Sequence, residues 1–246
     1  MIKKPEKRIP DFNFFVLVLS SIIYIFHSTA DVNMEKPIIA TTLSGLYVSS
    51  EPWKKAHILW FDEAAEQLGD ESVKQWAEKP DYFKGVDIVM KRLYPELSET
   101  ERTVKAREKF FDEICRYIEM NPEVKNEDVI EYFSSIKDKY TLALITTNTR
   151  EAAERILTVI GIRDLFDITE CAFPDEKDNK IIVFERFIQV HGKPALYIGG
   201  DRKDTFSYCS ANQIPCVFAN FEKVQDIESV ETCQSLDALA GIIEKL

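Results

Sequence analysis

Four short, continuously apolar runs, separated by segments with helical periodicity, constrain the fold of this chain more than any other feature. Such runs are typical of parallel strands that are buried on both faces of a sheet. Between them, apolar residues recur three or four positions apart, and Gly161 and Gly192 follow two of these segments as helix stop signals. The alternation predicts an α/β fold with a Rossmann-like, doubly wound parallel sheet. The apolar runs are residues 38–40, 142–145, 195–198 and 216–219, and the helical segments include 152–160, 184–188 and 239–243.

Residues 51–137 interrupt this alternation. Trp53, Trp60 and Phe61 begin a pattern of apolar residues at helical spacing, and prolines divide the segment into several pieces. The pattern predicts an all-helical insertion that directly follows the first strand.

Composition and charge narrow the possible functions. The length of 246 residues suits one large domain or a core with an insertion. The formal net charge is -11, and no run of Lys or Arg reverses that sign in the folded part, which argues against a nucleic-acid or anionic-membrane partner. The five cysteines include no Cys-x-x-Cys pair, and the three histidines form no metal-ligand pair. The cysteines therefore indicate buried thiols in a reducing compartment.

The first 33 residues stand apart from the fold argument. Lys and Arg residues precede an apolar run over residues 12–26, and Ser28 and Ala30 follow it with the spacing of a signal-peptidase site. This pattern is typical of a secretory signal or, less clearly, of a membrane anchor within residues 1–30. The composition of residues 1–33 also resembles translated AT-rich DNA, so we favour Met34 as the natural start and a cytoplasmic protein.

Residues 42–53 read Thr-Leu-Ser-Gly-Leu-Tyr-Val-Ser-Ser-Glu-Pro-Trp. This stretch resembles the first motif of the haloacid dehalogenase-like (HAD) phosphohydrolases, whose usual form is Asp-x-Asp-Gly-Thr-Leu-Val-x-Ser-Glu-Pro. In that family the first Asp attacks phosphorus and binds Mg²⁺, and the second acts as acid and base. Those two positions are Thr42 and Ser44 here. The positions that agree with the motif are Gly45, Val48, Ser50, Glu51 and Pro52.

Neither substituted residue replaces an aspartate chemically. The hydroxyl of Thr42 is a poor nucleophile without a base, and no histidine or lysine close in sequence offers one. Ser44 cannot exchange protons near neutral pH as a carboxylate can, and neutral hydroxyls are weak Mg²⁺ ligands.

The second and third family motifs hold the phosphate. The stretch Leu-Ala-Leu-Ile-Thr-Thr-Asn-Thr resembles the second motif, and the resemblance assigns phosphate binding to Thr147 and Asn148, with Thr146 as the alternative. The same residues could equally cap the following helix. For the third motif, a lysine that balances phosphate charge, Lys180 is the candidate and Lys177 the second choice.

The fourth motif is an acidic pair that follows a strand. The sequence Tyr-Ile-Gly-Gly-Asp-Arg-Lys-Asp over 197–204 resembles it, with Asp201 as the implied Mg²⁺ ligand. The usual second acid falls at Thr205, and Asp204, one position earlier, is the substitute. Residues 211–215 then stand where the family has Ala-Ala-Gly-Ile-Pro.

The resemblance covers residues 36–246 in the family's order. It implies a HAD-like core formed by residues 34–50 and 138–246, with residues 51–137 as a helical cap. We therefore expect a HAD-like protein that is catalytically silent and binds a small phosphorylated molecule or a protein partner, without a cofactor. The alternative is an active phosphatase of the phosphoglycolate-phosphatase or β-phosphoglucomutase-like group, with a rearranged site and Mg²⁺.

Overall fold

The computed structural model describes residues 36–79, 82–176, 178–200, 202–224 and 227–246. The predicted leader over residues 1–33, Met34, and the candidate site residues Lys177 and Asp201 lie outside the described residues.

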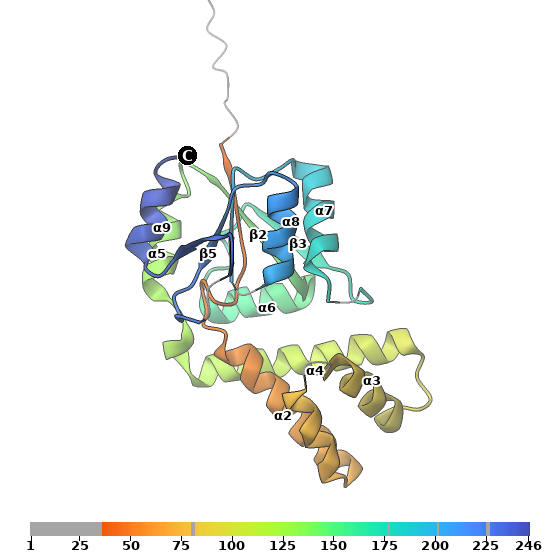
Figure 1. Cartoon of the computed structure of the whole chain (residues 1–246). Helices are drawn as coiled ribbons and strands as arrows, with labels where there is room; N and C mark the ends of the chain where they lie inside the picture. The colour runs from red at the N-terminus through yellow and green to blue at the C-terminus, as the bar shows by residue number, and fades with distance from the viewer. Residues whose placement is uncertain (1–35, 80–81, 177, 201, 225–226) are drawn as a thin grey trace, which may run out of the picture. The chain divides into compact units, whose positions relative to one another are not determined.

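Within the described residues, one parallel sheet of six strands has the order β3-β2-β1-β4-β5-β6 (Figure 1). The predicted doubly wound α/β fold is confirmed. Each of the four apolar runs coincides with a strand to within one residue, while β3 and β6 were not predicted because polar residues interrupt them. The strands are β1 (Ile38–Thr41), β2 (Thr141–Thr149), β3 (Ile168–Ala172), β4 (Leu196–Gly199), β5 (Cys216–Ala219) and β6 (Glu231–Cys233).

Alternate side chains of the central strands enter two separate cores. In β2, Leu142 and Leu144 pack into one core, whereas Ala143 and Ile145 pack into the other. Because successive side chains of a strand point to opposite faces, both faces of the sheet are buried. This double burial explains why the runs in the sequence are continuously apolar.

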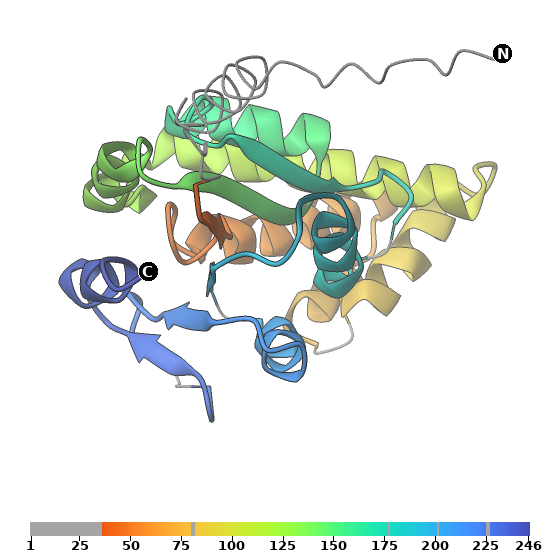
Figure 2. The ribbon, with the colours of Figure 1, turned by 90° about the horizontal axis from the view of Figure 1, so that it is seen from above.

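Helices cover both faces of the sheet, as Figure 2 shows from above. One face packs against α5 (Glu127–Ile136), α6 (Arg150–Ile160) and α9 (Leu236–Ile243). The other packs against α7 (Lys180–His191) and α8 (Lys203–Ala211).

The helical insertion after β1 is confirmed. It comprises α2 (Glu51–Leu68), η1 (Glu71–Glu78), α3 (Tyr82–Leu93), α4 (Glu99–Met120) and η2 (Pro122–Val124), followed by α5. The first four of these elements enclose a small core of their own, whereas the apolar side chains of α5 join the core beside the sheet. The precise domain limits stay a prediction. Among the described residues, no helix is long and apolar enough to span a membrane.

Candidate functional site

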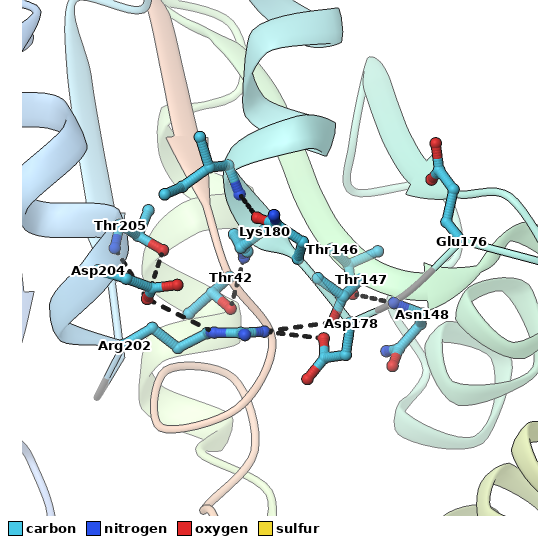
Figure 3. Close-up of polar contacts among 12 residues, drawn as sticks. Thr42, Thr146, Thr147, Asn148, Glu176, Asp178, Lys180, Arg202, Asp204 and Thr205 are labelled. Carbon is cyan, nitrogen blue, oxygen red and sulfur yellow. Dashed lines mark hydrogen bonds and ion pairs between the residues drawn. The ribbon is translucent and has the colours of Figure 1, made fainter. Parts of the chain in front are cut away.

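Polar residues gather where three neighbouring strands end. Thr42 directly follows β1, Thr146 and Thr147 lie near the end of β2, and Arg202 follows β4 closely. Because β1 lies between β2 and β4 and all three are parallel, their carboxyl ends meet at one edge of the sheet. Figure 3 shows that these side chains converge with Lys180 from the start of α7.

The loop after β1 is held tightly against the loop after β4. Gly45 has a φ of 77°, a left-handed conformation that suits glycine, and its N–H donates to the Val48 carbonyl over 2.7 Å. A Cβ atom on Gly200 would lie only 2.6 Å from the Ser44 carbonyl oxygen. The backbones of the two loops are therefore in contact, and this contact is possible because positions 45 and 200 are glycines.

Lys180 is the most buried charged residue of the site. It is the first residue of α7, only 2% of its surface is exposed, and its Nζ donates to Thr42 Oγ1 over 3.2 Å and to the Ile145 carbonyl. Burial, with a contribution from the nearby charge of Arg202, lowers the pKa of Lys180 from 10.5 to about 7. The structure thus brings together Lys180 and Thr42, and it places a lysine beside Thr42 where the local sequence offers none.

Arg202 is a second cation that sequence reasoning missed. Its Nη1 lies 2.9 Å from Asp178 Oδ1 and 3.5 Å from Thr147 Oγ1, and its Nε lies 3.8 Å from Asp204 Oδ1. Burial alone would lower the pKa of Arg202, but Asp178 and, to a smaller extent, Asp204 together raise it above its usual value. The only signal in the sequence was its position next to the acidic residue of the fourth motif.

Asn148, a predicted phosphate residue, and Thr146, the alternative to Thr147, are hydrogen-bonded to each other. The Asn148 N–H donates to Thr146 Oγ1 over 3.2 Å, and both residues are buried. Neither Thr147 nor Asn148 caps the following helix: Thr149 does, because its hydroxyl accepts from the Ala152 N–H over 3.3 Å. Thr147 is therefore the residue of this stretch whose hydroxyl faces a cation.

The insertion reaches the same edge of the sheet through Arg107 of α4. Its guanidinium donates to the carbonyl of Thr147 and, over 2.6 and 3.2 Å, to the carbonyls of Glu176 and Phe173. All of these acceptors are neutral. Burial lowers the pKa of Arg107, with partial compensation by acidic residues of the loop over 175–178.

The implied Mg²⁺ ligand Asp201 lies outside the described residues, and Thr42 and Asp204, which the structure describes, are poorly suited to hold Mg²⁺. Thr42 presents a hydroxyl that already accepts from an ammonium group, and the Asp204 carboxylate accepts from the Thr205 N–H over 2.9 Å and lies near Arg202. Among the residues that the structure describes, no three His, Cys, Asp or Glu side chains cluster as metal ligands. Mg²⁺ prefers oxygen ligands that include carboxylates, and here two cations occupy the corresponding surroundings.

Polar residues at the strand ends of a doubly wound sheet are typical of a ligand-binding site in an α/β protein. Residues 54–218, more than half of the chain, match the sequence profile of haloacid dehalogenase-like hydrolases. The chain belongs to this family. The matched region begins after the first motif, so it includes neither Thr42 nor Ser44. No curated protein shows significant sequence similarity to the chain.

Several solved structures share the fold of this chain at low sequence identity. A HAD phosphatase from Thermococcus onnurineus is 16% identical, with a TM-score of 0.55 over 84% of this chain and 97% of that one. CbbY from Rhodobacter sphaeroides in complex with phosphate is 13% identical, with a TM-score of 0.54 over 80% and 92%. A mutant of CbbY in complex with xylulose-(1,5)bisphosphate is 14% identical, with a TM-score of 0.56 over 81% and 94%.

Proposed function

We propose that this HAD-family chain binds the phosphoryl group of a small phosphorylated molecule without hydrolysing it. The observation that carries the proposal is the buried ammonium of Lys180, whose hydrogen-bond acceptors are the Thr42 hydroxyl and the Ile145 carbonyl. Both acceptors are neutral, so among the described residues no acidic group contacts this buried charge, although Asp178 and Asp204 act on it from farther away.

The first reason to propose that the chain does not hydrolyse its ligand is the chemistry of the side chains of Thr42 and Ser44. Hydrolysis through an aspartyl phosphate needs a carboxylate nucleophile and a second carboxylate to move protons. Thr42 and Ser44 carry hydroxyls, and the described histidines lie elsewhere, His57 against Tyr82 and His191 against Phe187. Neither position therefore supplies a carboxylate that could activate water for attack on a bound phosphoryl group.

Phosphate binding needs none of these carboxylates. Lys180 offers a cation, Thr147 offers a hydroxyl, and Arg202 offers a guanidinium whose planar donors suit phosphate oxygens. Two aspartates that would repel an anion in the absence of metal are replaced by hydroxyls. The complexes of CbbY with phosphate and with xylulose-(1,5)bisphosphate support a small phosphorylated ligand for this chain as well.

Two measurements on the full chain test the proposal. Inorganic phosphate at millimolar concentration, with EDTA present, should raise the melting temperature, because a ligand that binds only the folded state stabilises it. Turnover of para-nitrophenyl phosphate with Mg²⁺ should be roughly 10⁴-fold or more below that of an active family member, as when catalytic groups that act as a unit are lost.

The outcomes separate the alternatives. Robust turnover that Asp201→Asn abolishes would establish the rearranged phosphatase instead. Absence of both turnover and a thermal shift would leave only the protein-partner form of the silent protein.

A further inference from the structure

Two of the five cysteines lie against each other where α8 ends and β5 begins. Cys209 is in the last turn of α8 and Cys216 is the first residue of β5, so residues 210–215 form the whole connection. The connection reverses the chain tightly: the Ile214 N–H donates to the Cys209 carbonyl over 2.9 Å, and Gln213 has a φ of 56°. Both cysteine side chains pack into the same core on one face of the sheet, and their thiols are hydrogen-bonded.

Cys216 differs from the other cysteines in exposure. The structure describes all five, and four of them are buried, whereas Cys216 is only partly buried. A small oxidant in solution can therefore reach this thiol, and the thiol that it reaches has a second thiol beside it. An accessible cysteine next to a partner that can resolve its oxidised form is the arrangement of a redox-sensitive pair.

The hydrogen bond between the two thiols gives them different roles. Cys209 donates this bond, which lowers the pKa of the Cys216 thiol against the opposing effect of burial. The same bond, together with burial, raises the pKa of Cys209. Burial raises the pKa of Cys115, Cys171 and Cys233 as well. Because the thiolate is the reactive form, Cys216 is the thiol that should react first with a peroxide.

We propose that Cys209 and Cys216 form a reversible disulfide when the chain meets a peroxide, and that Cys216 is the thiol that is oxidised first. The pair lies at the amino end of β5, whereas the polar site lies at the carboxyl ends of the strands. The inference therefore does not rest on the phosphoryl-binding function proposed above. In reducing compartments, disulfides of mesophilic proteins are usually transient ones of this kind.

The reaction balances with hydrogen peroxide as the only other reactant. The Cys216 thiolate attacks a peroxide oxygen, so an S–O bond forms, the O–O bond breaks, and hydroxide leaves with the electron pair and takes a proton from solvent. The Cys209 sulfur then attacks the Cys216 sulfur, an S–S bond forms, and the S–O bond breaks. The leaving hydroxide takes the Cys209 proton and becomes water. Overall the two sulfurs are oxidised to a disulfide, and the peroxide is reduced to water.

The first step prepares Cys209 for the second. Before oxidation, the Cys209 proton is held in the hydrogen bond to Cys216, which is the main reason for its raised pKa. Conversion of Cys216 to a neutral sulfenic acid removes the negative charge that favoured this proton, so the Cys209 thiol becomes easier to ionise. The two sulfurs are already neighbours, so α8 and β5 need not separate for the bond to form.

The test is treatment of the reduced full chain with hydrogen peroxide, followed by denaturation and alkylation with N-ethylmaleimide. Trypsin releases residues 204–223 as one peptide, which contains both cysteines of the pair and no other. After peroxide this peptide should carry no alkyl group and an internal disulfide, and after dithiothreitol both of its cysteines should be alkylated. In the folded, reduced chain, Cys216 should be alkylated roughly tenfold or more faster than the buried Cys171.

Three variants separate the roles of the two thiols. In Cys209→Ala the reaction should stop at a sulfenic acid on Cys216, which dimedone traps. In Cys216→Ser the buried Cys209 should stay unmodified. Cys171→Ala, which removes a buried cysteine of β3, is the matched control and should form the disulfide like the wild type.

Several results would overturn the inference. These are an unmodified peptide 204–223 in the wild type, a bond to another cysteine, a dimer linked through Cys216, and oxidation that dithiothreitol does not reverse. A dimedone adduct on Cys209 in Cys216→Ser would contradict the assignment of Cys216 as the first thiol to react.

Discussion

The two cations of the site have opposite surroundings. Lys180, beside the end of β1, is 2% exposed, and within the described part of the chain it bonds to a hydroxyl and a carbonyl. Arg202, after the end of β4, has a side chain that is 34% exposed and lies 2.9 Å from Asp178 and 3.8 Å from Asp204. Of the groups that the structure describes, no carboxylate contacts the buried charge of Lys180, whereas two carboxylates compensate the half-buried charge of Arg202.

This difference indicates which cation an anion would use. A ligand that reaches Lys180 removes the cost of a buried, uncompensated charge, whereas a ligand that reaches Arg202 must compete with carboxylates already bound there. In both cases the contact with Thr42 or Thr147 is a hydroxyl that can rotate to serve the ligand. The β1 side of the site should therefore dominate phosphate affinity.

The largest effect should come from Lys180→Met. At pH 6, where Lys180 is protonated, this variant should bind phosphate roughly 10- to 100-fold more weakly, because a hydrogen bond to a charged group contributes about 1.5–3 kcal/mol. Calorimetry with inorganic phosphate measures the change. Lys139→Met is the control for net charge. It removes an exposed lysine that precedes β2, whereas the site lies where β2 ends. Equal affinity in both variants would assign the binding to Arg202 instead.

The same residue should impose a pH dependence on stability. The pKa of Lys180 is about 7 in the folded chain and about 10.5 in the unfolded chain, so the unfolded chain binds more protons between these values. Wild-type stability should therefore rise relative to Lys180→Met as the pH increases from about 7 to 10. Below pH 7 both states of the wild type are protonated, and the full cost of the buried charge remains.

Urea unfolding of both proteins at pH 6 and pH 9 measures this difference, and all other titrating groups cancel in the comparison. Parallel stability profiles would mean that the amine is not buried in its charged form, and the contrast with Arg202 would disappear.

The sequence predicts the central part of the fold well, for a physical reason. β1, β2, β4 and β5 are covered on both faces, so each contains a continuous apolar run that is easily recognised. β3 carries Thr169 and Glu170, and β6 begins with Glu231, so neither has that pattern. These two strands form the edges of the sheet, where polar side chains are tolerated.

The site is predictable only as positions along the chain. Lys180 and Thr42 are both candidates from the sequence, but they are 138 residues apart, and no local pattern reveals their hydrogen bond. Arg202 gives no signal by itself, because a lone arginine is ordinarily a solvated residue. The roles of Thr147, Asn148, Lys180 and Asp204 stay predictions that the experiments above address.

Gly200→Ala should disturb the contact between the two sides of the site. Its Cβ atom would lie 2.6 Å from the Ser44 carbonyl oxygen, and backbone cannot move aside as a side chain can. We expect a loss of about 1–3 kcal/mol in the free energy of unfolding, as in other overpacked sites. Gly241→Ala, which meets nothing within 4 Å, is the matched control and should not destabilise. Equal stability of the two variants would show that the loops are not in contact.

The smallest effect, and one of opposite sign, should come from Asp178→Asn. The carboxylate of Asp178 holds Arg202 Nη1 at 2.9 Å, with side chains that are 30% and 34% exposed. Its removal frees the guanidinium for a ligand and deletes a negative charge that repels phosphate. Because partly exposed ion pairs contribute about 0.5–1 kcal/mol, we expect phosphate to bind roughly two- to fivefold more tightly.

Asp138→Asn, which changes an exposed aspartate before β2, is the control and should leave the affinity for phosphate unchanged. The gain should also fall as salt increases, since a half-exposed guanidinium is screened more than the buried Lys180. Weaker binding in Asp178→Asn would mean that this carboxylate positions Arg202 for the ligand rather than competing with it.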